Sequence, residues 1–138
     1  MKQNFHTVTI PTQGARLYEF TATAEVFIGK SGITDGLLTC FIRHTSASLL
    51  IQENADPNVW HDLIAAFVRL APEDFPYKHD EEGPDDMPPH IKSALTAVSI
   101  GVPVKGGKLM LGTWQGLYLF EHRHAAHRRE VLLHLIGE

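Results

Sequence analysis

Short apolar segments with a period of two constrain this chain more than any other feature, because that period belongs to strands. Val131, Leu133 and Leu135 occupy alternate positions, so they share one face of a strand. Segments 37–42 and 117–120 are apolar on both faces. Such strands need cover on both sides, from a second sheet, a helix layer or a neighbouring subunit. The predicted strands span 7–10, 17–20, 37–44, 49–53, 98–104, 109–114, 117–122 and 130–136.

Three other segments have helical periodicity. The clearest is 57–70, where Asp56 can cap the first turn and Pro57 suits the first helical position. The two shorter predicted helices span 21–30 and about 88–98. The pattern predicts an α+β fold: one domain over residues 1–138, built as a sandwich-like system of antiparallel sheets with two or three helices.

The distribution of charge excludes several classes of partner. Residues 73–86 hold seven acids and one Lys, although the net charge of the whole chain is only −4. The chain lacks the Lys/Arg stripe of a duplex-binding surface, so we expect no nucleic-acid partner. The longest segments without a charged residue are well short of the roughly 20 apolar residues that span a bilayer, so we expect no membrane partner. No secretory signal is visible and Cys40 is the single cysteine, which favours the cytoplasm.

Nine histidines direct attention to metal and proton chemistry, because neutral imidazole is the commonest metal ligand. His44 continues the apolar row of a predicted strand and is expected to point inward. Thr45 and Ser46 follow it with hydroxyl groups suited to gripping phosphate. The alternative is a hydrogen-bonded core histidine beside a Ser/Thr turn.

Two acidic features also suggest a site. Glu53 extends the inward row of strand 49–53, and an inward carboxylate needs a partner, a proton or a metal. His79 and His90 enclose five carboxylates in a Gly/Pro-rich stretch, which could close around a divalent cation or a Mg-bound diphosphate. The competing interpretation of this stretch is a solvated loop.

The last candidate region begins with two glycines that enclose Thr113, Trp114 and Gln115. Glycines at a strand junction permit either close backbone approach to a ligand or a tight bulge. Downstream, Arg123 could hold an anion with two parallel hydrogen bonds. A surface salt bridge with Glu121 is the alternative role for this arginine.

Three stretches closely resemble the YjbQ family, small proteins identified as secondary thiamine-phosphate synthase enzymes. They are FIRHTSASLLIQENADPNVWHDL at 41–63, HDEEGPDDMPPHIKSAL at 79–95 and GTWQGLYLFEHR at 112–123. The resemblance implies an α+β homotrimer with a polar pocket near the subunit boundary. The matching polar positions are His44, Thr45, Ser46, Glu53, Asn54, His79, Asp80, His90, Thr113, Gln115, Glu121, His122 and Arg123.

The leading hypothesis is a weak or secondary synthase that joins a pyrimidine diphosphate to a thiazole phosphate and releases pyrophosphate. Two alternatives are a metal-dependent hydrolase of a small phosphorylated or acylated metabolite, and a non-catalytic ligand-binding trimer in which His44 and Glu53 satisfy each other. In the leading hypothesis a divalent ion, Mg or Zn, is held by His44, His79 and His90. The catalytic residues are Glu53, Asp80 and His122. The residues that bind phosphate or ligand are Thr45, Ser46, Asn54, Thr113, Gln115 and Arg123.

Overall fold

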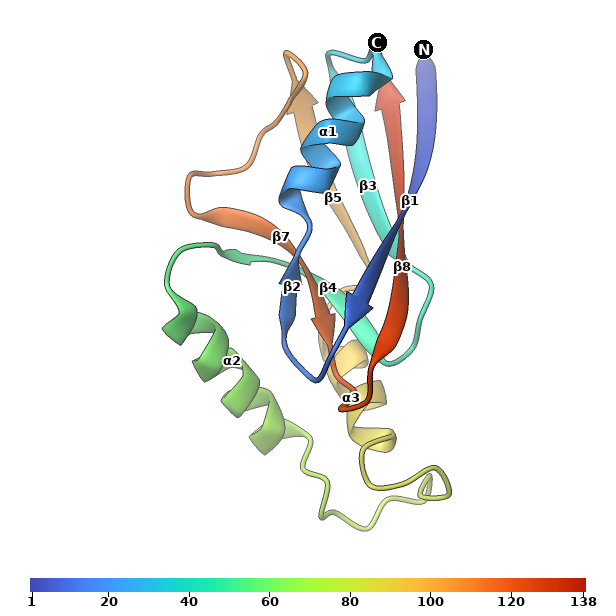
Figure 1. The fold of residues 1–138 in the computed structure, drawn as a ribbon, viewed down its shortest axis with the longest axis vertical. Helices are drawn as coiled ribbons and strands as arrows, with labels where there is room; N and C mark the ends of the chain where they lie inside the picture. The colour runs from blue at the N-terminus through green and yellow to red at the C-terminus, as the bar shows by residue number, and fades with distance from the viewer.

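The computed structural model describes residues 1–138 as three helices and eight strands (Figure 1). The helices are α1 (Thr21–Ser31), α2 (Pro57–Leu70) and α3 (Met87–Leu95). The strands are β1 (Lys2–Thr12), β2 (Leu17–Glu19), β3 (Gly36–Ile42), β4 (Ala47–Glu53), β5 (Ser99–Lys105), β6 (Lys108–Leu109), β7 (Gln115–Glu121) and β8 (His127–Gly137). No helix has the length and apolar character needed to cross a bilayer.

The strands form two antiparallel sheets. One sheet has five strands in the order β1-β8-β3-β5-β6, and the other has three in the order β2-β7-β4. A cluster of 17 buried apolar residues takes members from both sheets and from α1, so the sheets share one core. The single-domain α+β fold predicted from the sequence is therefore confirmed. The alternation in β8 is confirmed as well, since Val131, Leu133 and Leu135 are completely buried.

Several element boundaries differ from the prediction. Strand β3 ends at Ile42, so His44 does not continue its inward row, and β1 is longer than expected. Two further differences have a local cause. The segment expected as a strand at 109–114 keeps only β6, because hydrogen bonds turn it into a loop: Gly112 N–H donates to Gln115 Oε1 and Gln115 N–H donates to Gly112 O. The third helix ends before Val98, because the Val98 carbonyl accepts a hydrogen bond from the Ile42 N–H instead.

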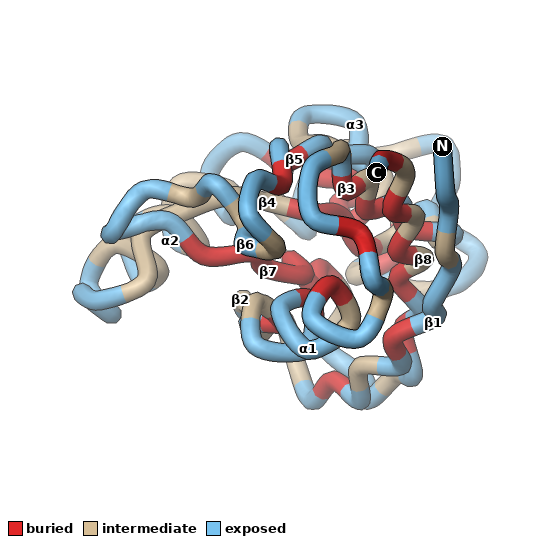
Figure 2. The backbone as a smooth tube through the Cα atoms, turned by 90° about the horizontal axis from the view of Figure 1, so that it is seen from above, coloured by how far each residue is buried: buried red, intermediate tan, exposed pale blue.

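Helix α2 lies at the side of the molecule, away from the five-stranded sheet (Figures 1 and 2). As predicted, Asp56 caps it by accepting the Asn58 N–H at 2.9 Å. Trp60 donates its indole N–H to the Glu53 carbonyl, and Phe67 packs edge-on against Phe120. No residue of α2 is fully buried within this chain.

Candidate metal centre

Two imidazoles and one carboxylate converge where the acidic loop enters α3. Asp86 is the residue before the first turn of α3, and His90 lies one turn further on the same helix face. His79 comes from the preceding loop. One ligand atom from each of His79, Asp86 and His90 lies within 4.8 Å of the other two. His79 Nε2 is hydrogen-bonded to Asp86 Oδ2, and His90 Nε2 is 3.8 Å from the same oxygen.

The ring of His90 is held with one nitrogen free to act as a ligand. Its Nδ1 lies 3.1 Å from the Thr45 carbonyl oxygen. A carbonyl only accepts, so Nδ1 carries the proton and, in the neutral ring, Nε2 presents its lone pair to Asp86. This is the usual arrangement of a metal-binding histidine, whose second ring nitrogen donates to a carbonyl or carboxylate.

Asp86 is the buried member of the group, with a side chain only 4% exposed. Burial alone would raise the pKa of its carboxyl, but hydrogen bonds from neighbours including His79, together with the charge of Arg123, hold that pKa below its ordinary value. Arg123 Nη1 donates to Asp86 Oδ1 at 2.7 Å. The carboxylate therefore stays ionised, with one oxygen on Arg123 and the other facing the imidazoles.

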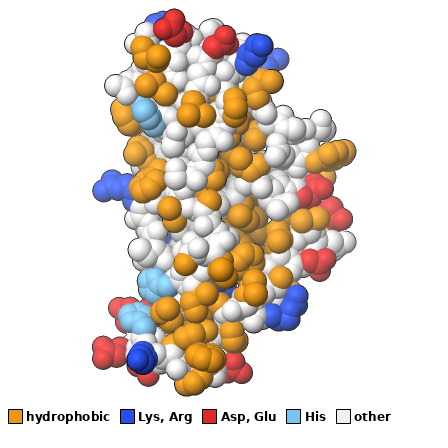
Figure 3. Space-filling view, turned by 180° about the vertical axis from the view of Figure 1, so that it is seen from behind, with side chains coloured by type: hydrophobic (Ala, Val, Ile, Leu, Met, Phe, Trp, Pro, Cys, Tyr) orange, Lys and Arg blue, Asp and Glu red, His pale blue; other side chains and the backbone are white.

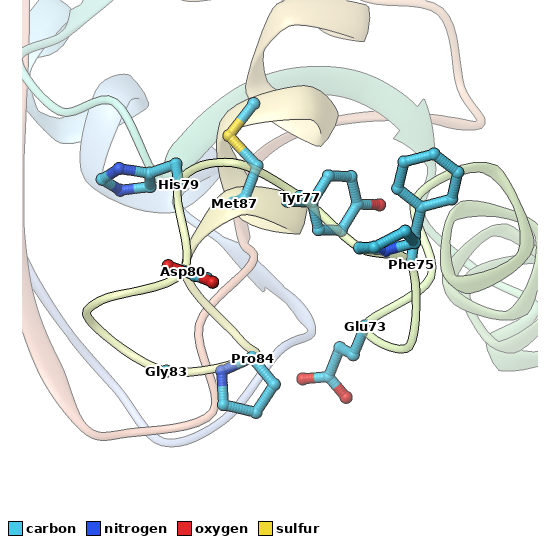
Figure 4. Close-up of a pocket in the computed structure, with 9 residues that line it drawn as sticks. Glu73, Phe75, Tyr77, His79, Asp80, Gly83, Pro84 and Met87 are labelled. Carbon is cyan, nitrogen blue, oxygen red and sulfur yellow. The ribbon is translucent and has the colours of Figure 1, made fainter.

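An open pocket of about 290 Å³ adjoins the centre and includes His79 in its lining (Figure 4). In Figure 4, His79 and Asp80 lie on one side of it, Phe75 and Tyr77 on the other, and Met87 reaches in from α3. Asp80, predicted to be catalytic, is exposed in this wall and is not one of the converging groups. The pocket thus offers both polar and aromatic surface beside the two imidazoles.

His44 and Glu53, two other predicted site residues, lie apart from this group. His44 Nε2 accepts the Glu130 N–H at 3.0 Å, and Glu53 Oε2 accepts the Ala55 N–H at 2.8 Å. Each therefore has a local partner, and they do not pair with each other as the binding-trimer hypothesis expected. The structure replaces His44 with Asp86 in the candidate ligand set.

Behind the centre, a buried ion pair joins β7 to β8. Glu121, which is fully buried, accepts hydrogen bonds from Arg129 Nε and Nη2 at 2.7 and 2.6 Å. Arg129 Nη2 also donates to Ser46 Oγ at 2.9 Å, so the hydroxyl predicted to grip phosphate is held by an arginine. The alternative role for Arg123, a surface salt bridge with Glu121, is absent, because each side chain has a different partner.

His122 is enclosed next to this ion pair. Its Nε2 lies 2.9 Å from Ser48 Oγ, and its Nδ1 is buried without a hydrogen-bond partner. Burial first, then the charge of Lys92, lower the pKa of His122 to about 3. The ring is therefore neutral at physiological pH, and its role is that of a core histidine rather than an exposed acid or base.

Three predicted ligand-binding residues line a second pocket of about 360 Å³. Thr113 and Gln115 lie at the beginning of β7 and Asn54 follows the end of β4, whereas Arg123 follows the end of β7. Asn54 Nδ2 donates to the carbonyls of Thr113 and Gln115, so its role is to hold the loop. Glu19 and Glu25 also line this pocket and no basic residue does, which makes it unsuited to phosphate.

The sequence offered a signal for Asp86 that was not used. Asp86 lies just before the helix predicted from about residue 88 and four residues before His90, a spacing that places two side chains on one face once the helix begins earlier. The prediction treated the carboxylates of the loop as equivalent and so overlooked the spacing between Asp86 and His90.

Comparisons with known proteins agree with the resemblance. The family model described as UPF0047 protein YjbQ-like matches residues 6–138. The UPF0047 protein sll1880 of Synechocystis sp. is 51% identical over 138 residues, covering 99% of this chain and 94% of that protein. UPF0047 protein YjbQ of Salmonella typhimurium is 46% identical over 80% of each chain.

Solved structures show the same fold. A YjbQ/UPF0047 family protein from Clostridium acetobutylicum superposes with a TM-score of 0.89 at 32% identity, covering 95% of this chain and 99% of that one. A conserved hypothetical protein from Thermus thermophilus superposes with a TM-score of 0.86, also at 32% identity and with coverage of 95% and 99%. On this evidence the chain belongs to the YjbQ-like UPF0047 family.

Proposed function

We propose that this protein is a divalent-metal-dependent enzyme that acts on a small phosphorylated metabolite. The observation that carries the proposal is the convergence of His79, Asp86 and His90, with the Nδ1 proton of His90 directed away from the centre. Two nitrogens and one oxygen suit zinc or a similar transition metal better than magnesium, which prefers oxygen ligands. Three protein ligands leave coordination positions open, as in catalytic rather than structural zinc sites.

The adjoining pocket supports a small organic substrate. Phe75 and Tyr77 pack together with ring centroids 5.0 Å apart, and with Met87 they offer apolar contact to a ring or chain. His79 belongs to both the pocket and the ligand set, so a substrate seated there would have its anionic end at the metal. A bound divalent ion would supply the positive charge that a phosphorylated substrate and a departing phosphate require.

The specific reaction we propose is thiamine-phosphate synthesis. In this reaction the C–O bond from the pyrimidine methylene to its diphosphate breaks, and a C–N bond to the thiazole nitrogen forms. That nitrogen carries no proton, so the protein must orient two substrates and balance the charge of the leaving pyrophosphate, without a general base. The converging ligand groups and the aromatic pocket beside them support this proposal.

Hydrolysis of a phosphorylated metabolite is the second candidate, favoured by one observation. Glu82 Oε2 lies 3.8 Å from His79 Nε2, close to the candidate centre. A hydrolase needs a general base to accept the proton of the attacking water, and Glu82 is the carboxylate placed for it. Glu82→Gln therefore separates the two reactions: a hydrolase loses most of its turnover, whereas the synthase retains it.

Metal content and turnover test the proposal together. The purified protein, stripped with a chelator and reloaded with Zn²⁺, is expected to retain about one ion per chain and to convert the two thiamine precursors. His79→Ala/His90→Ala is expected to lose both properties, while His61→Ala, at an exposed position on α2, serves as the matched control. Normal turnover by the double variant would overturn the proposal.

A further inference from the structure

We propose that Arg123 is a positioning residue of the metal centre, which fixes the Asp86 carboxylate so that one oxygen stays directed at the two imidazoles. The inference rests on the proposed function and concerns the same site. It replaces the expectation that Arg123 binds phosphate.

Each guanidinium nitrogen of Arg123 lies within hydrogen-bonding distance of a carboxylate oxygen. Nη1 donates to Asp86 Oδ1 at 2.7 Å, while Nε and Nη2 lie 3.4 Å from Asp85 Oδ2 and Oδ1. The arginine side chain is only 22% exposed. Two neighbouring carboxylates offset the charge of this guanidinium, so it attracts a substrate phosphate less strongly.

The two oxygens of Asp86 consequently have separate roles. Oδ1 is held by Arg123, and Oδ2 is hydrogen-bonded to His79 and lies 3.8 Å from His90 Nε2. Rotation of the carboxylate would break the bond to Arg123, so the oxygen that faces the imidazoles stays in place. Outer groups that orient ligands in this way typically contribute 10–100-fold to metal affinity.

Arg123 is itself anchored in the core. Its backbone N–H donates to Glu121 Oε2 at 3.2 Å, and that buried carboxylate is held by Arg129 and by Thr12. The backbone of Arg123, two residues beyond the end of β7, is therefore tied to this buried carboxylate. Through Arg123, the ion pair between Glu121 and Arg129 helps to set the position of Asp86 at the start of α3.

Zn²⁺ affinity, measured by competition with a chromogenic chelator, tests the inference. Arg123→Met and Arg123→Gln are each expected to bind Zn²⁺ about 10–100-fold more weakly than the unmodified protein. Arg123→Lys is expected to recover part of the loss, because its ammonium still reaches one carboxylate oxygen. Arg128→Met, which removes an exposed arginine of β8, is the matched control and should bind normally.

The visible spectrum of bound Co²⁺ provides a readout that general destabilisation does not move. With Arg123→Met or Arg123→Gln saturated by Co²⁺, loss of the Asp86 oxygen should shift and weaken the d–d bands, and Arg123→Lys should restore them. Affinity within threefold of the unmodified protein together with an unchanged spectrum would overturn the positioning role. Failure of the unmodified protein to bind either ion would instead refute the proposed function. Should Arg123→Met not fold, Arg123→Gln decides the question.

Discussion

His122 is the residue that links folding to pH most directly. Because burial lowers the pKa of its ring from 6.5 to about 3, the unfolded chain binds a proton between these values that the folded chain does not. Stability therefore falls as the pH falls from about 6.5 towards 3, by about 1.4 kcal/mol per pH unit from this group. We predict that His122→Gln, whose amide can still bond Ser48, loses less stability than the unmodified protein between pH 6.5 and pH 5.

Urea denaturation at several pH values measures this effect. The range above pH 5 is chosen because carboxylates contribute little there. His61→Gln is the matched control, since His61 lies at an exposed position on α2. Parallel slopes for the unmodified protein and His122→Gln would contradict the prediction.

At the residue scale, the sequence predicted the types of group in the centre better than their arrangement. His79 and His90 were selected from their spacing around the acidic loop, and the structure brings both to one carboxylate. Asp80 was chosen in place of Asp86, because sequence alone does not show which acid of a loop is buried. Which acid is buried depends on Arg123, which follows β7 and is 37 residues away along the chain from Asp86.

At the scale of elements, the register between β3 and β8 leaves room for nothing beyond a hydrogen atom at Gly36. A Cβ at this position would lie 2.2 Å from the Ile136 carbonyl oxygen, which is backbone and cannot rotate away. We predict that Gly36→Ala destabilises the protein by about 1–3 kcal/mol, as expected for overpacking. A Cβ added at Gly29 in α1 would have no atom within 4 Å, so Gly29→Ala should stabilise the protein by about 0.5–1 kcal/mol.

Thermal or urea unfolding of the two alanine variants, in parallel with the unmodified protein, gives both differences. Opposite signs are expected because the added methyl group is the same and only its surroundings differ. Equal effects would mean that the strands separate easily at Gly36 and that their register is weakly fixed.

The elements most visible in the sequence were those set by local pattern. Alternation located the interior of β8, and Asp56 with Pro57 located the start of α2. The segment after β6 was misassigned as a strand, because its conformation depends on the side chains of Gln115 and Asn54 bonding to its backbone. Such contacts leave no periodic signal.

At the scale of the whole molecule, one face of the five-stranded sheet has no cover within the chain. Leu38 and Cys40 of β3 point into the core and are completely buried, while Leu37 and Phe41 on the opposite face are 44% and 43% exposed. Leu37 pairs with Ile136 and Phe41 with Leu132 in β8, which continue the apolar surface across the strands. Figure 3 shows hydrophobic side chains along this face, with most charged groups at its edges.

We predict that this face associates with further copies of the chain, as the homotrimer implied by the family resemblance requires. Strands that are apolar on both faces need cover on both, and the second sheet supplies it on only one. Light scattering during gel filtration should therefore give about three times the 15.4-kDa chain mass.

Leu37→Lys/Phe41→Lys should shift the mass towards the single chain, because burying two ammonium groups opposes assembly. Val26→Lys, on the exposed side of α1, keeps the same kind of added charge as a control and should leave the mass unchanged. A monomeric unmodified protein would contradict the prediction, and a double variant with unchanged mass would place the assembly surface elsewhere.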